Sequence, residues 1–515
     1  MVNNLIKSTI LVAFLTIISK LFGFFKSVIQ ASYYGSSIYT DAFNMAYGVV
    51  GDILYMLTTS IAVAFVPYYI SLKKDNGISK SKIQSSKIIT LLSIYASIGS
   101  IVLIIFAPYI IRVVAPSYSG EQFDLTVVAF RIMTLGIAFS LTANCYQSVL
   151  NSERIYGYSS FASIINSIVL IVFIILGYAQ FGIYALIVAI PVSYLIQFIV
   201  LYIKGCKFCE CTLKYGLKDN SINVLMAQAM PILIGNATIE INQAVDRFLL
   251  TNVGVGAVTA VAYAGTLYQL IANTISVPLS SVVFTELSED GAKDTLDDMR
   301  NLLKKGYEAI LCISIPFSVV MFLNARDIVE IVYGHGQFTG NAITQTAEGL
   351  AFYSLCIVPI AVKQLLTKAY YALNDTKNPM KIGIMEVVTN TVFSIALSEI
   401  YGIAGVVGAT ALSSLLFSCV LFVHFSRKHV VIDVSVTNLF KYVIAILVCV
   451  AVSAGIKGNG YDMVFLHFIV ESSVCFFIFY SALYIMKEKN ICNIVNIIVC
   501  KIASRRALAD GSNEN

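Results

Sequence analysis

Apolar runs long enough to cross a bilayer recur along nearly the whole chain, separated by short polar segments. A transmembrane helix needs about 20 predominantly apolar residues, because the hydrocarbon core is roughly 30 Å thick and each helical residue rises about 1.5 Å. These runs lie near 8–34, 41–71, 87–115, 124–150, 156–178, 181–203, 221–252, 257–285, 302–323, 342–373, 380–400, 403–425, 437–456 and 463–486. The pattern predicts an all-α polytopic membrane protein with about 14 transmembrane helices.

The composition agrees with this pattern and excludes an ordinary soluble domain. The chain of 515 residues is 58% hydrophobic and only 12% charged. The first apolar run is longer than the apolar core of a signal peptide and lacks a small-residue cleavage site, so we expect it to be retained as a helix.

Basic residues alternate between loops, which predicts an orientation. The loops near 35–40, 116–123, 178–181, 253–256, 334–341 and 400–403 hold no Lys or Arg. The intervening loops, which hold clusters of Lys and Arg, are 72–87, 204–218, 293–305, 377–381, 427–428 and the tail 487–506. By the positive-inside rule, both termini are cytoplasmic. The net charge of +5 therefore reflects topology, and we expect no nucleic-acid partner.

Polar motifs recur at an offset of roughly 220 residues, which predicts an internal duplication. The matched motifs are Leu150–Arg154 with Leu373–Lys377, Asn166 with Asn390, Phe181–Ile183 with Tyr401–Ile403, and Thr40–Phe43 with Val258–Val261. We expect two six-helix lobes in a pseudo-two-fold repeat plus two C-terminal helices. Such parallel repeats are typical of transporters that use alternating access.

The repeat divides the chain into five predicted regions. They are an N-lobe over 1–204, a cytoplasmic linker over 205–219, a C-lobe over 220–428, two extra C-terminal helices over 429–487 and a cytoplasmic tail over 488–515.

Two lysines, Lys20 and Lys26, lie in the middle of the first apolar run. A cation at membrane depth costs about 2.5–3.5 kcal/mol on insertion scales, so it normally faces a partner or a wet cavity. The alternative is that the long side chains reach the membrane surface. Both lysines lie several turns from the ends of the run, which favours a cavity that receives an anion. Six residues apart, they are separated by about 9 Å along an ideal helix and by about 120° around it.

Other charged residues fall inside or beside apolar runs. Asp41 is interpreted either as the cap of the second helix or as a functional acid. For Asp52 two interpretations are open, namely an ion pair with a first-helix lysine or packing among polar groups. Asp246 and Arg247 are neighbours that point apart on a helix, so we expect each to pair with another helix. Lys363 is the candidate cavity lysine of the tenth run.

The chain shows no catalytic or cofactor constellation. The four histidines are scattered without a carboxylate or nucleophile at motif spacing. Cys206, Cys209 and Cys211 supply half of a zinc-site pattern and lack the second ligand pair. We therefore expect no enzyme activity, no cofactor and no metal.

The chain resembles the MurJ/MviN lipid II flippase family, within the multidrug/oligosaccharidyl-lipid/polysaccharide exporter superfamily. The likeness covers roughly 5–487. The segments that carry it are Lys20–Ser27, Thr40–Phe43, Ala64–Pro67, Val245–Phe248, Gly334–Phe338 and Ala369–Pro379.

The resemblance implies a central cavity between the lobes and a groove for a polyprenyl tail formed by the last two helices. The implied substrate is an undecaprenyl-pyrophosphate-linked cell-wall precursor, lipid II first. It would be moved from the inner to the outer leaflet of the bacterial plasma membrane.

The chain departs from the family pattern at several cavity positions. Lys20 and Lys26 stand where the family has arginines, and Thr266 and Gln269 replace an arginine and a glutamate. With Lys20, Lys26, Asp41, Asp52, Arg247 and Lys363, we expect Thr259, Thr266 and Gln269 to bind substrate.

The departures leave two other functions open. One is a flippase for another lipid-linked polysaccharide unit, of capsule or teichoic type. The other is a non-transporting scaffold that recruits wall-synthesis membrane proteins.

Overall fold

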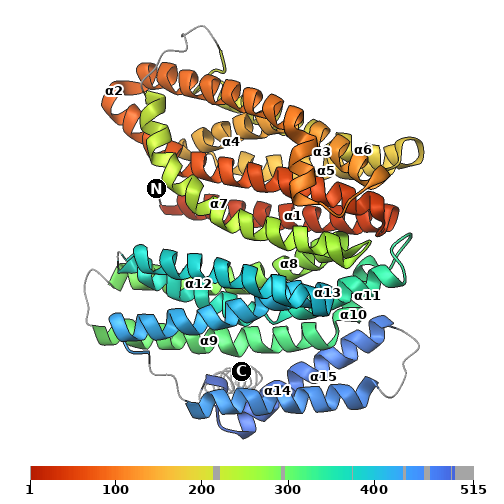
Figure 1. The fold of residues 1–515 in the computed structure, drawn as a ribbon. Coiled ribbons are helices and arrows are strands. Elements are labelled where there is room, and N and C mark those ends of the chain that lie inside the picture. Colours follow the sequence, from red (N-terminus) through yellow and green to blue (C-terminus); the bar gives the residue numbers. More distant parts are fainter. Residues whose placement is uncertain are drawn as a thin grey trace, which may run out of the picture. The chain divides into compact units, whose positions relative to one another are not determined.

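The computed structural model describes residues 2–212, 221–290, 296–373, 375–432, 436–457, 464–488 and 490–492. Within these residues the regular structure is helical, without strands (Figure 1). The helices are α1 (Val2–Tyr34), α2 (Ile38–Val114), α3 (Gly120–Thr134), α4 (Gly136–Ser152), α5 (Gly157–Phe181), α6 (Ile183–Gly205), α7 (Ser221–Val253), α8 (Ala257–Asp290), α9 (Leu296–Leu323), α10 (Ala325–Tyr333), α11 (Asn341–Ser354), α12 (Ile357–Ala372), α13 (Lys377–Lys428), α14 (Val436–Lys457) and α15 (Val464–Ile485).

The predicted all-α membrane architecture is confirmed. Among the described residues, 11 helices are long and apolar enough to cross a membrane, or 12 if the bent pair α11 and α12 is one span. Helix α2 bends at Gly77 and supplies two of these spans, whereas α13 has 52 residues and bends at Gly402. A total of fourteen requires counting α13 twice and adding α8, so that number stays a prediction.

The chain forms two compact units. The first comprises Met1–Thr266, Val332–Gln345 and Ser394–Val406. In it α2 packs against α3, α4 and α7, and α5 lies between α1 and α6. The limits of the predicted lobes stay a prediction, and much of the linker (213–219) and of the tail (493–515) lies outside the described residues.

The second unit comprises Leu267–Ile331, Thr346–Phe393 and Val407–Asn515. Helix α9 packs against α12, and the hairpin of α14 and α15 rests on α9. Buried residues of all three helices share one apolar cluster, including Leu311 of α9, Tyr442 of α14 and Phe479 of α15. Burial of such side chains contributes roughly 1.5–3 kcal/mol each, which holds the extra hairpin on its unit.

The duplicated motifs have the same local structure in both copies. Gly182 has φ 51° and ψ −131°, and Gly402 has φ 56° and ψ −125°. A residue with a side chain rarely adopts this positive φ, so both bends require glycine. Asn166 donates to Ser193 Oγ at 3.1 Å, and Asn390 donates to Ser413 Oγ at 3.0 Å. The duplication therefore preserves backbone conformation and side-chain contacts.

The two matched turns each hold a carboxylate that fixes basic side chains. Glu153 accepts hydrogen bonds from Lys73 at 2.6 Å and from Tyr69 at 2.8 Å. In the second copy, Asp375 pairs with Lys428 at 2.8 Å and His429 at 3.1 Å. The hydrogen bond from Lys428 is the largest influence holding the pKa of Asp375 well below its usual range.

Candidate functional site

The first candidate residue, Asp41, lies where the N-terminal turns of α2 and α8 meet. The Asp41 side chain is buried and accepts hydrogen bonds from the backbone N–H of Gly256 at 2.5 Å and of Thr259 at 2.9 Å. It also accepts the Thr259 hydroxyl at 2.6 Å. The cap of α2 itself is Ser37, through a capping box with Thr40. Asp41 is therefore a helix cap, but it caps α8 and not its own helix α2. Helix α8 is the counterpart of α2 in the repeat.

Thr259 is part of the same junction. Its hydroxyl donates to Asp41 and accepts from Asn44 Nδ2 at 3.0 Å, and its side chain is fully buried. Gly256 has φ 89°, and a Cβ there would lie 2.6 Å from Ser36 Oγ. The close approach of the two helix starts thus depends on glycine, and both polar side chains are occupied in holding it.

We expect Asp41→Ala to destabilise the protein by about 2–4 kcal/mol, because it leaves buried N–H groups at the start of α8 without an acceptor. Asp41→Asn, which retains one acceptor oxygen, should lose less than half of that. Melting temperature and membrane abundance of the two variants measure the effect. Equal stability of Asp41→Ala and the parent would contradict the capping role.

An ion pair joins the next two candidates, Asp52 of α2 and Arg247 of α7. The two side chains are only 15% and 16% exposed. A Cβ on Gly48, one turn before Asp52, would lie 2.9 Å from the Arg247 side chain, so this glycine lets the guanidinium group lie against α2. Asp52 thus pairs with α7 and not with a first-helix lysine.

The expectation that the neighbours Asp246 and Arg247 contact different helices is confirmed. Asp246 accepts a hydrogen bond from Ser394 Oγ of α13 at 3.0 Å, whereas Arg247 contacts Asp52 of α2. Both residues therefore fix α7 within the first unit.

The first-helix lysines differ in their surroundings. The Lys26 side chain is half-buried, with Nζ 3.5 Å from Gln30 Oε1 and 5.8 Å from the centroid of the Tyr47 ring on α2. Lys20 is exposed. Among the described residues, no carboxylate oxygen lies within 4.0 Å of either ammonium group. Lys26 is thus a cation held beside an aromatic face, without a carboxylate partner.

The residue after Lys26, Ser27, has a packing role. Ser27 is buried, donates to the Phe24 carbonyl at 2.7 Å and shares a hydrogen bond with the Tyr333 hydroxyl at 3.2 Å. It secures α1 to Tyr333 within the first unit, next to Lys26.

In the second unit, Lys363 is paired. Its ammonium group forms an ion pair with Glu386 of α13 and donates to Ser414 Oγ at 3.2 Å. Glu386 was not among the predicted site residues, although it is the acid nearest the middle of the apolar run 380–400. Thr266 donates to the Ala262 carbonyl of its own helix at 3.0 Å, and the Gln269 side chain is exposed on α8.

The histidines and cysteines show where a metal could bind. Burial raises the pKa of the Cys209 thiol to about 12, so this cysteine is a poor thiolate ligand. In the described part of the chain, one group of His, Cys, Asp or Glu side chains brings three ligand atoms within 4.8 Å of one another, namely Asp327, His467 and Glu471. Glu471 lies four residues after His467, one helical turn later, and Asp327 comes from α10, so the sequence pattern had not singled out this group.

Comparison with known proteins gives consistent matches. The family model described as lipid II flippase MurJ matches residues 30–478. A probable lipid II flippase MurJ of Rickettsia prowazekii is 25% identical over 437 residues, which are 83% of this chain and 85% of the relative. The lipid II flippase MurJ of Burkholderia cenocepacia is 24% identical, over 82% of this chain and 84% of the relative.

Solved structures show the same fold. A lipid II flippase MurJ in an inward closed conformation has a TM-score of 0.80 at 22% identity, covering 92% of this chain and 99% of the other. An inward-facing multidrug resistance MATE family transporter of the MOP superfamily has a TM-score of 0.69 at 12% identity, covering 81% and 97%.

Proposed function

This chain belongs to the lipid II flippase MurJ family, since the family model matches residues 30–478, and from that membership we propose that it moves lipid II across the membrane. The substrate is a lipid-linked anionic glycan precursor of the cell wall, carried from the inner to the outer leaflet by alternating access. The match over most of the chain is the observation that carries this proposal, and the repeat of two helical halves agrees with it.

The ion pairs of the basic candidate residues indicate which of them contact the substrate. Arg247 and Lys363 each have a carboxylate partner, Asp52 and Glu386, so their charges are already compensated. In the part of the chain that the structure describes, Lys26 has no carboxylate partner, and Lys20 is exposed on the same helix. We assign the contact with the pyrophosphate to these two lysines, as charge-assisted hydrogen bonds from their ammonium groups.

Orientation and partners follow from the same proposal. With both termini in the cytoplasm, the basic loops face the cytoplasmic leaflet and its anionic lipids. Wall-synthesis membrane proteins that deliver or consume the precursor are the proposed protein partners. The chain acts as a transporter and not as an enzyme.

The test is complementation of a bacterial strain depleted of its own lipid II flippase. We expect the chain to restore growth, and a variant in which Lys20 and Lys26 are both leucine to fail at equal membrane abundance. Absence of growth despite normal membrane expression would remove the lipid II assignment. Growth with the double leucine variant would favour the scaffold, which needs no substrate-binding lysines.

A further inference from the structure

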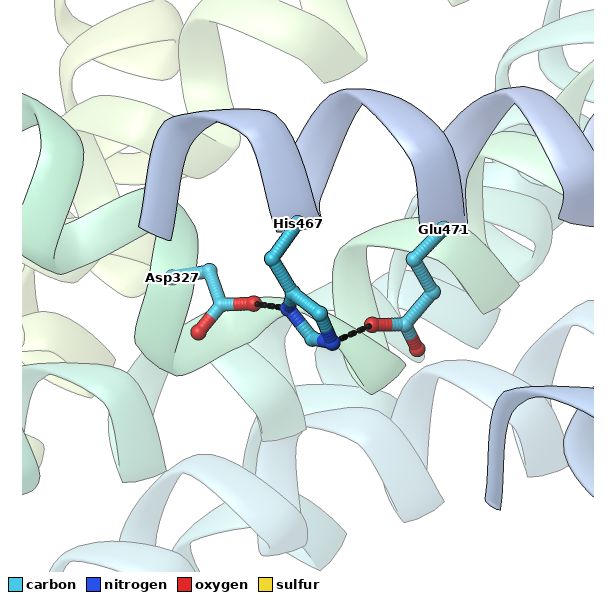
Figure 2. Close-up of side chains that lie close together, drawn as sticks. All are labelled: Asp327, His467 and Glu471. Carbon is cyan, nitrogen blue, oxygen red and sulfur yellow. Dashed lines mark hydrogen bonds and ion pairs between the residues drawn. The ribbon is translucent and has the colours of Figure 1, made fainter. Parts of the chain in front are cut away.

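Asp327, His467 and Glu471 meet within the second unit, far from the lysines of α1 in the sequence (Figure 2). Asp327 lies in the first turn of α10, and His467 and Glu471 lie one turn apart near the start of α15. Figure 2 shows the imidazole ring between the two carboxylates, with one ring nitrogen toward each. Spacing of four residues places His467 and Glu471 on one face of α15.

The two ring nitrogens of His467 lie at different distances from their carboxylate neighbours. Nδ1 lies 2.9 Å from Asp327 Oδ2, a hydrogen-bond distance, and a carboxylate can only accept, so Nδ1 carries the proton. In the neutral ring, Nε2 then presents its lone pair toward Glu471 Oε2, which lies 3.7 Å away. That separation exceeds a hydrogen bond. A metal ion between Nε2 and Oε2 would be bound by both atoms at once.

The separation of Nε2 and Oε2 fits a divalent metal. Zinc binds imidazole nitrogen at about 2.0–2.1 Å and carboxylate oxygen at about 2.0–2.2 Å, so a tetrahedral angle places the two atoms roughly 3.3–3.5 Å apart. The 3.7 Å between Nε2 and Oε2 corresponds to a more open angle, of about 120–135°. A divalent ion there would also bring positive charge next to the two carboxyl groups of Asp327 and Glu471.

Burial makes this compensation important. Glu471 is 0% exposed, and its other oxygen accepts a hydrogen bond from Ser453 of α14. Charges buried in protein are costly unless they are paired or coordinate a metal. Carboxylates that hold the second nitrogen of a metal-bound imidazole are the usual outer partners of such sites.

We propose that His467 Nε2 and Glu471 bind a divalent cation of the zinc class, with Asp327 as the positioning residue that holds the imidazole. The ion would connect α15 with α10 through Asp327 and with α14 through Ser453, and so fasten the C-terminal hairpin. With the predicted topology, the site lies toward the external side of the membrane, where water completes the coordination.

The test uses the full-length protein in detergent, stripped with a chelator and then supplied with Zn2+. We expect one Zn2+ per chain by elemental analysis. We also expect a rise in melting temperature of roughly 2–5 °C at about 100 times the Kd. His467→Gln and Glu471→Gln should lose both effects, and Asp327→Asn should weaken binding roughly 10–100-fold.

His429→Gln is the matched control, because His429 also pairs with a carboxylate, Asp375, at 3.1 Å. It should bind Zn2+ like the parent. If His467→Gln fails to fold, the parent and Asp327→Asn still decide the question by their Zn2+ affinities. Stripped parent that takes up no Zn2+, or that is equally stable with and without it, would overturn the proposal and leave a protonated imidazole between the carboxylates.

Discussion

Replacing Arg247 with alanine is expected to destabilise the protein by about 3–5 kcal/mol, because it leaves the Asp52 carboxylate buried without its partner. The double variant Asp52→Ala with Arg247→Ala removes both charges and should recover much of that loss. With the single variant Asp52→Ala added, melting temperature in detergent and abundance in the membrane measure the three variants side by side. The double-mutant cycle that they form gives the coupling energy of the pair.

Arg131→Ala is the matched control for this experiment. Arg131 is exposed, and its guanidinium group donates to the Ile104 carbonyl at 3.2 Å. Its loss should change stability by less than about 1 kcal/mol. If Arg247→Ala kept normal stability but lost flipping, Arg247 would be a substrate contact and the structural assignment of the pair would fail.

Lys26→Ala is expected to reduce flipping of lipid II by about 10–100-fold while membrane abundance stays normal. A hydrogen bond to a charged group contributes roughly 1.5–3 kcal/mol, which corresponds to this range. Removing the lysine strands no carboxylate, since Asp52 is paired with Arg247. Lys26→Arg should retain or improve flipping, because the guanidinium group keeps the charge and adds a second donor toward phosphate.

Lys363→Ala provides the contrast for Lys26→Ala. Loss of the Lys363 ammonium group leaves Glu386 without its ion-pair partner, so we expect low membrane abundance of this variant. Lys20→Ala should keep normal abundance, like Lys26→Ala, with a smaller loss of flipping. Abundance by immunoblot and flipping in membrane vesicles separate the two kinds of effect. Normal abundance together with normal flipping in Lys20→Ala and Lys26→Ala would remove these lysines from the substrate contact.

The sequence by itself determined the helical membrane architecture and the duplication. In a bilayer every backbone group must be paired internally, so the length and hydropathy of a segment suffice to identify a spanning helix. The matched positions of Gly182 and Gly402 could be recognised in the sequence for a similar reason. A bend at a residue with positive φ is a local property of the chain that favours glycine.

The tertiary structure alone decided the partners of the charged residues. Arg247 meets Asp52 across 195 positions, and Asp41 accepts a hydrogen bond from Gly256, 215 positions later, just before α8 begins. His467 likewise finds Asp327 across 140 positions. Which charges meet depends on how each helix is rotated about its axis and which neighbour it packs against. The apolar pattern of a membrane helix determines neither, because its lipid-facing and protein-facing sides are both apolar.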